Sequence, residues 1–111
     1  MSIFFKLMGM KGQDNGATLL SSMEFMSKIE NAKVQLVDVR TEMEFRAGHI
    51  KGAKNIDFYS GKFVEEFEKF DKSKPIFIYC RSGARSGQAS RKLIKMGFIE
   101  VYDLKGGILS L

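Results

Sequence analysis

The sequence of 111 residues has one cysteine, one histidine, one proline and no tryptophan. A single cysteine excludes an internal disulfide, and a single histidine leaves no Cys/His cluster that could hold structural zinc. The one proline excludes proline-rich and collagen-like chains. No stretch of about 18 apolar residues occurs, so we expect no membrane span. The absences point to a globular chain without a structural metal or disulfide.

The composition is that of a single globular domain. Hydrophobic residues make up 44% of the chain and charged residues 28%, which argues against intrinsic disorder. The net charge is +5, from 18 basic and 13 acidic residues, and the lysines are scattered. Nucleic-acid binding requires a clustered basic patch or a reading motif, so we expect no nucleic-acid partner. The charge is typical of a solvated lysine surface, and it also favours steering of anionic substrates.

The first 17 residues differ from the rest, and we interpret them as a leader before a domain at 18–111. Lys6 interrupts the apolar run of the opening segment MSIFFKLMGM, which is not the pattern of a secretory signal. This segment predicts a loose leader or a short amphipathic helix, with weak membrane-surface contact as the alternative. Residues 12–17 are polar and Gly-rich, as in a linker. Without a signal we expect a cytoplasmic location, where a free cysteine is either inert or reactive.

Capping motifs and apolar periodicity predict four helices. Capping boxes of the form Ser/Thr-x-x-Glu occur at 21–24 and 41–44, and they are typical of helix starts. Phenylalanines recur at helical spacing within 63–70, and Val64 joins them on the predicted apolar face. The expected helices span residues 22–31, 41–48, 58–70 and 86–96.

Runs of β-branched and aromatic residues predict the strands that alternate with these helices. The expected strands span residues 34–39, 53–57, 75–80 and 98–102. The segment PIFIYC at 75–80 is apolar throughout, as in a central strand buried on both faces. The alternation predicts an α/β fold with a mainly parallel sheet of about five strands and helices on both faces. In such sheets the site lies at the carboxyl ends of the strands.

Cys80 and the loop after it, Arg-Ser-Gly-Ala-Arg, form the strongest candidate site. Because the cysteine ends a buried strand just before a helix, the loop can turn successive backbone N–H groups toward one point. Gly83 supplies the backbone freedom for this curl, and Arg81 and Arg85 add positive charge. These groups and the helix N-terminus favour thiolate over thiol. The pattern predicts a nucleophilic thiolate beside an oxyanion cradle, against the alternative of a buried cysteine packed as a small hydrophobe.

Four segments carry a family resemblance through their order and spacing. They are LVDVRT at 36–41 with Glu44-Phe45, GHIKGAKNI at 48–56, IYCRSGARS at 78–86 and LKGGI at 104–108. Together they resemble the single-domain rhodanese family of thiosulfate or persulfide sulfurtransferases, over about residues 18–111. The resemblance implies a rhodanese-like α/β fold.

The resemblance also implies a covalent sulfur transfer that needs no metal or organic cofactor. Cys80 would take the sulfane sulfur of a small anionic donor such as thiosulfate and carry it as a persulfide. A thiol, a protein cysteine or cyanide would then accept the sulfur. The amides that would cradle the donor belong to Arg81, Ser82, Gly83, Ala84 and Arg85. The side chain of Arg81 or Arg85 would stabilise the leaving sulfite, and we expect a monomer.

Asp38 and Arg40 follow one another closely at the end of the 34–39 strand, beside the proposed loop. One interpretation is a structural ion pair or cap, for example Arg40 with Glu44. The other is that Asp38 orients the loop without touching the substrate. Both interpretations stay open from the sequence.

Two further motifs flank the proposed loop. His49 could act as a base for Cys80, but we interpret it as a structural turn residue because the loop itself already favours the thiolate. The Gly106-Gly107 pair predicts a tight turn near the site.

Alternative functions also stay open. The active-site loops of cysteine phosphatases and arsenate reductases have five residues between the cysteine and the arginine. Here four residues separate Cys80 from Arg85. A phosphoryl group needs a wider cradle than a sulfane sulfur, so the shorter loop favours sulfur. Two alternatives to an active sulfurtransferase are a persulfide carrier and a non-enzymatic module that only binds a partner. Retention of Cys80 favours the enzyme.

Overall fold

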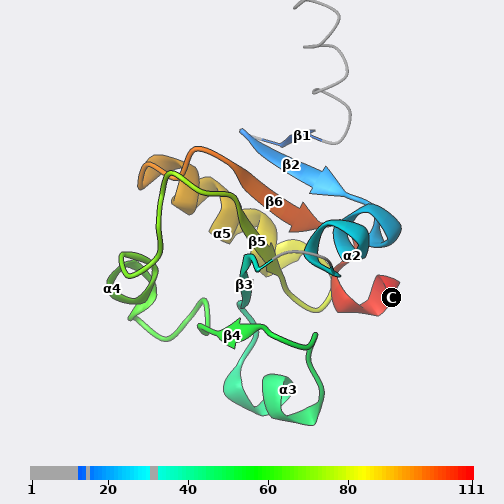
Figure 1. The fold of residues 1–111 in the computed structure, drawn as a ribbon. Coiled ribbons are helices and arrows are strands. Elements are labelled where there is room, and N and C mark those ends of the chain that lie inside the picture. The colour runs from blue at the N-terminus through cyan, green and yellow to red at the C-terminus, as the bar shows by residue number, and fades with distance from the viewer. Residues whose placement is uncertain (1–12, 15, 31–32) are drawn as a thin grey trace, which may run out of the picture.

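A six-stranded sheet forms the centre of the computed structural model, which describes residues 13–14, 16–30 and 33–111 (Figure 1). The strand order is β1-β2-β6-β5-β3-β4. β1 pairs antiparallel to β2 at one edge, and the other neighbours are parallel. The strands are β1 (Gln13–Asp14), β2 (Ala17–Leu20), β3 (Gln35–Asp38), β4 (Lys54–Asn55), β5 (Ile76–Tyr79) and β6 (Val101–Leu104).

Helices cover both faces of this sheet. They are α2 (Ser22–Glu30), α3 (Glu42–Ala47), α4 (Phe63–Phe67), α5 (Ala84–Lys95) and the 3-10 turn η1 (Gly107–Ser110). One core cluster, which we call the α5-side core, includes apolar residues of α4 and α5. The other, the α2-side core, includes Phe25 of α2, with Ile108 of η1 packed against it. The α/β fold predicted from the sequence is therefore confirmed.

β5 is buried on both faces, as its apolar sequence predicts. Ile78 and Cys80 belong to the α5-side core, whereas Phe77 and Tyr79 belong to the α2-side core. This alternation follows from the two-residue period of a strand. It places the Cys80 side chain on the α5 side of the sheet.

The prediction of a linker over residues 12–17 is wrong at residues 13, 14 and 17, which lie in strands. Gln13–Asp14 form β1, and Ala17 opens β2 with 1% of its surface exposed. β2 has only four residues, and its sequence gives little local signal for a strand. It is stabilised by pairing with β6, which lies far along the chain. The division into a leader at 1–17 and a domain at 18–111 stays a prediction. The expected leader segment at 1–10 lies outside the described residues.

The helix expected over 58–70 is much shorter, because α4 spans only Phe63–Phe67. Turns precede it, including hydrogen bonds from the Tyr59 and Ser60 amides to Asp57. The phenylalanine stripe is buried as predicted at its centre, but the predicted packing of Val64 is wrong, since that side chain is 46% exposed. A five-residue helix turns only part of its surface toward the sheet.

Two boundaries near the carboxyl end also differ from the prediction. α5 begins at Ala84 rather than at residue 86, so it takes up the last two residues of the expected loop. The last strand is Val101–Leu104 rather than 98–102. Phe98 and Ile99 precede this strand, and their amides donate to the carbonyls of Leu93 and Lys72. Among the residues that the structure describes, no helix is long and apolar enough to span a membrane.

Candidate active site

Cys80 directly follows β5 and lies at the carboxyl end of the central strands. Its side chain is buried, with 1% of the residue exposed. The backbone N–H of Gly83 donates a hydrogen bond of 3.0 Å to the Cys80 sulfur. One backbone amide of the following loop therefore faces the Cys80 sulfur.

The loop after Cys80 is short because α5 begins at Ala84. Gly83 is the residue that makes this turn possible, with a φ of 112° in the left-handed region that favours glycine. Arg81 and Ser82 are exposed, and the N-terminus of α5 follows at once. The loop thus brings the Gly83 amide to the sulfur and places the N-terminus of α5 directly after it.

Arg85 is held by a carboxylate from a distant part of the chain. Its guanidinium forms two hydrogen bonds to the carboxylate of Glu44, of 2.7 and 3.0 Å. These bonds from Arg85 lower the pKa of Glu44 to about 2, and the same carboxylate raises the pKa of Arg85. The Arg85 guanidinium is therefore paired with a carboxylate, which leaves Arg81 as the exposed arginine of the loop.

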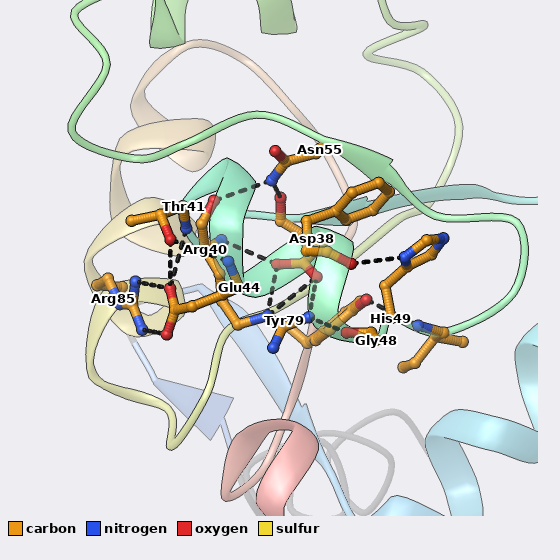
Figure 2. Close-up of polar contacts among 11 residues, drawn as sticks. Asp38, Arg40, Thr41, Glu44, Gly48, His49, Asn55, Tyr79 and Arg85 are labelled. Atoms are coloured by element: carbon orange, nitrogen blue, oxygen red, sulfur yellow. Dashed lines mark hydrogen bonds and ion pairs between the residues drawn. The ribbon is translucent and has the colours of Figure 1, made fainter.

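Glu44 is itself positioned by the capping box of α3. The Thr41 side chain accepts a hydrogen bond from the Glu44 amide, and the Thr41 amide donates to the Glu44 carboxylate (Figure 2). The second capping box predicted from the sequence is confirmed. It fixes the carboxylate so that it faces Arg85, and it joins the end of β3 to the start of α5.

Asp38 and Arg40 form a buried ion pair rather than a pair with Glu44. The Asp38 carboxylate accepts hydrogen bonds from the Arg40 backbone and side chain, the closest at 2.6 Å. The side chains are 0% and 7% exposed. The suggested pair of Arg40 with Glu44 is wrong, because Glu44 engages Arg85. A further bond of the Arg40 side chain, 2.7 Å to the Gly48 carbonyl, ties the strand end to the turn after α3.

Asn55 completes this buried network, a role that the sequence reasoning missed. Its side-chain amide donates to the backbone carbonyls of Asp38 and Arg40, at 3.0 and 2.8 Å (Figure 2). These bonds hold the backbone at and just after the end of β3. The available signal was the motif at 48–56, where Asn55 stands in a short strand.

His49 and Tyr79 are engaged in the same region. The His49 Nδ1 donates to the carbonyl of Phe45, at 2.8 Å, and the ring stacks on Phe45 with centroids 3.7 Å apart. The turn role predicted for His49 agrees with these contacts. The buried Tyr79 hydroxyl accepts from the Ile50 amide, and burial raises the pKa of Tyr79 well above its ordinary value. These residues shape the turn after α3.

The Gly106-Gly107 pair forms the tight turn predicted from the sequence, and it lies against the loop. Both glycines have positive φ, 79° and 66°. A Cβ on Gly107 would lie 2.3 Å from the carbonyl oxygen of Arg81, which is an impossible approach for any other residue. Across residues 13–14, 16–30 and 33–111, no three His, Cys, Asp or Glu side chains gather in a group that could hold a metal ion.

The sequence is similar to several known proteins. The family model of the rhodanese-like domain matches residues 21–110. The chain is 44% identical over 75 residues to the uncharacterized protein YqhL of Bacillus subtilis (strain 168), across 68% of this chain and 58% of that protein. It is 33% identical over 88 residues to the thiosulfate sulfurtransferase GlpE of Coxiella burnetii, across 79% of this chain and 80% of GlpE.

Part of the similarity is to longer proteins. The chain is 33% identical over 102 residues to the tRNA uridine(34) hydroxylase of Aster yellows witches'-broom phytoplasma (strain AYWB), across 88% of this chain. It spans 58% of the length of YqhL and 33% of the length of this hydroxylase.

A solved structure supports the same relationship. The crystal structure of a rhodanese-like domain protein from Staphylococcus aureus matches with a TM-score of 0.74 and 29% identity, across 83% of this chain and 88% of that one. The family match over residues 21–110 includes the Cys80 loop. The chain therefore belongs to the rhodanese-like domain family.

Proposed function

We propose that this chain is a sulfurtransferase that moves a sulfane sulfur from thiosulfate or a persulfide donor through a persulfide on Cys80. The observation that carries the proposal is the hydrogen bond of 3.0 Å from the Gly83 amide to the Cys80 sulfur, within a loop that begins a helix. The similarity to GlpE, named a thiosulfate sulfurtransferase, supports the same reaction.

The first half of the reaction loads Cys80. The thiolate attacks the outer sulfur of thiosulfate, a new S–S bond forms, and the bond from that sulfur to the sulfonate group breaks. Sulfite leaves with the electron pair, and its negative charge is stabilised by the loop amides and by the exposed Arg81. The amides of residues 81–85 are the proposed cradle. Arg85 contributes through its backbone, because its side chain engages Glu44.

The second half returns Cys80 to the thiolate. An acceptor thiolate attacks the terminal sulfur of the Cys80 persulfide, and the S–S bond breaks with the electron pair on Cys80. A thiol leaves as a persulfide, and cyanide leaves as thiocyanate. The cycle balances without an external oxidant or reductant, and no metal or organic cofactor takes part in it.

A steady-state assay tests this proposal. With thiosulfate and cyanide varied against each other, thiocyanate formation should give parallel double-reciprocal lines, as a covalent ping-pong cycle requires. Cys80→Ser should abolish the rate. Intersecting lines, or a rate that survives in Cys80→Ser, would refute a persulfide on this residue. Activity with persulfide donors but none with thiosulfate would identify a carrier that serves a protein acceptor.

A second candidate function is a rhodanese-like module that acts as one part of a larger enzyme or binds a partner. The observation that favours it is the similarity to tRNA uridine(34) hydroxylase, of whose length this chain spans 33%. Retention of the cysteine and its loop favours the sulfurtransferase. A cysteine phosphatase is disfavoured because its loop needs an arginine to bind the phosphoryl group. Arg85 is the arginine nearest to that position, and its guanidinium is bound to the Glu44 carboxylate.

A further inference from the structure

η1 contacts the Cys80 loop through backbone hydrogen bonds. The Ile108 amide donates to the Cys80 carbonyl at 2.9 Å, and the Leu109 amide donates to the Arg81 carbonyl at 3.1 Å. These two carbonyls therefore point toward η1. They are the first two carbonyls after β5, at the point where the chain leaves the sheet.

The direction of these carbonyls fixes the direction of the next two amides. In a planar trans peptide, the C=O of one residue and the N–H of the next point in opposite directions. None of the described residues has a cis peptide bond. The amides of Arg81 and Ser82 therefore point away from η1.

The side away from η1 is the side of the Cys80 sulfur. Ile108 of η1 packs against the α2-side core, whereas Cys80 belongs to the α5-side core on the opposite face of the sheet. The Gly83 amide already points to this side, because it donates to the Cys80 sulfur. Three successive amides, at residues 81, 82 and 83, thus face the same side as the nucleophile.

We propose that η1 is the positioning element of the anion cradle: its two backbone bonds orient the Arg81 and Ser82 amides toward an anionic sulfur donor at Cys80. This inference rests on the proposed function, since it assigns the part of the fold that prepares the same site. Amides that are oriented before the donor arrives need no reorganisation when charge develops on the leaving sulfite.

Gly107 is the positioning residue that permits this contact. A Cβ at Gly107 would lie 2.3 Å from the Arg81 oxygen, 2.4 Å from the Arg81 carbonyl carbon and 2.6 Å from the Ser82 nitrogen. All three atoms belong to the one peptide that η1 orients. Gly107→Ala must therefore push η1 away from the loop and release the two carbonyls.

Gly106 offers a matched control. It has a similar positive φ, 79° against 66°, so alanine there carries comparable backbone strain. A Cβ at Gly106 would meet the Ser110 side chain at 3.2 Å and none of the loop backbone within 4 Å. The two variants thus differ mainly in whether the loop peptide is displaced.

The test compares alkylation of Cys80 by an anionic and a neutral reagent, iodoacetate and iodoacetamide, through the ratio of their rates. An anion cradle should raise this ratio about tenfold above that of free cysteine in the wild type and in Gly106→Ala. Gly107→Ala should lose most of that increase while it still reacts with iodoacetamide. A folded Gly107→Ala protein with the ratio of Gly106→Ala, or a wild-type ratio equal to that of free cysteine, would overturn the inference.

A measurement on the wild type decides the question if Gly107→Ala does not fold. Inorganic sulfate, titrated into the protein, should shift the NMR signals of the Arg81 and Ser82 amides while the Ile108 and Leu109 amides stay protected from exchange. Unmoved Arg81 and Ser82 signals would overturn the inference. Neither readout needs sulfur transfer, so a wild type that gains no sulfur but shows these effects refutes the proposed function alone.

Discussion

At the scale of single residues, Glu44 joins two parts of the site that lie 41 residues apart in sequence. Its carboxylate closes the capping box with Thr41 and also binds Arg85. The capping box follows from local spacing and was predicted from the sequence. The bond to Arg85 was not, because no local pattern indicates which distant cation a capping carboxylate will face.

Glu44→Gln should reduce stability in a pH-dependent way. The pKa of Glu44 is lowered from 4.5 to about 2 in the folded state, chiefly by the hydrogen bonds from Arg85. Its contribution is therefore complete above about pH 4.5 and is lost as the pH falls from there toward about 2. We expect Glu44→Gln to lower the free energy of unfolding by about 1 kcal/mol at neutral pH. The free energy of unfolding of Glu44→Gln should also fall less steeply than that of the wild type between about pH 4.5 and about pH 2.

Urea unfolding at several pH values measures this effect. Glu42→Gln is the control, because Glu42 and Arg46 form an exposed pair in the same helix, with side chains 69% and 75% exposed. That variant should change stability by less than about 0.5 kcal/mol. The role assigned to the pair with Arg85 would be contradicted if both variants lost the same free energy of unfolding. It would also be contradicted if the stability of Glu44→Gln fell with acid pH as steeply as that of the wild type.

Arg40→Met should be strongly destabilising because it leaves the fully buried Asp38 carboxylate without its partner. Removing one member of a buried pair costs about 3–5 kcal/mol. The double variant Asp38→Asn with Arg40→Met should recover part of that loss, since no charge is then buried. Denaturant unfolding of the single and double variants gives the coupling free energy. Additive losses would show that the two side chains do not depend on one another.

At the scale of elements, α4 shows where helical periodicity misleads. The phenylalanine stripe correctly predicts burial of Phe63 and Phe67, but the helix has five residues and leaves Val64 exposed. Phe67→Ala should therefore lower the free energy of unfolding by about 3–5 kcal/mol. Val64→Ala should cost less than about 1 kcal/mol. Thermal or denaturant unfolding checks both, and comparable losses would contradict the observed face of α4.

Two glycines, one directly before α5 and one within it, make opposite conformational demands. Gly83 has a φ of 112° at the helix start, whereas Gly87 lies within the helix, and a Cβ there would meet no atom within 4 Å. Gly87→Ala should raise the free energy of unfolding by about 0.5–1 kcal/mol, because alanine is the better helix former. Gly83→Ala should lower it by about 1–2 kcal/mol through left-handed strain. Denaturant unfolding of both variants measures the signs, and a stabilising Gly83→Ala would contradict the loop geometry.

At the scale of the whole molecule, the sheet collects the site from segments far apart in sequence. The carboxyl ends of parallel strands meet at one edge, and that rule predicted the position of Cys80. β2 escaped prediction because its four residues depend on pairing with β6. The orienting role of η1 escaped as well, since it depends on backbone bonds to the loop rather than on side chains with a recognisable pattern.

The most direct test of the central claim is the mass of the intact protein after incubation with thiosulfate. Cys80 is the only cysteine in the chain, so the site of any added sulfur is unambiguous. The account predicts a gain of one sulfur atom on the wild type, reversed by a reducing thiol and absent in Cys80→Ser. A wild type that gains no sulfur from thiosulfate or from any persulfide donor would contradict the sulfurtransferase proposal.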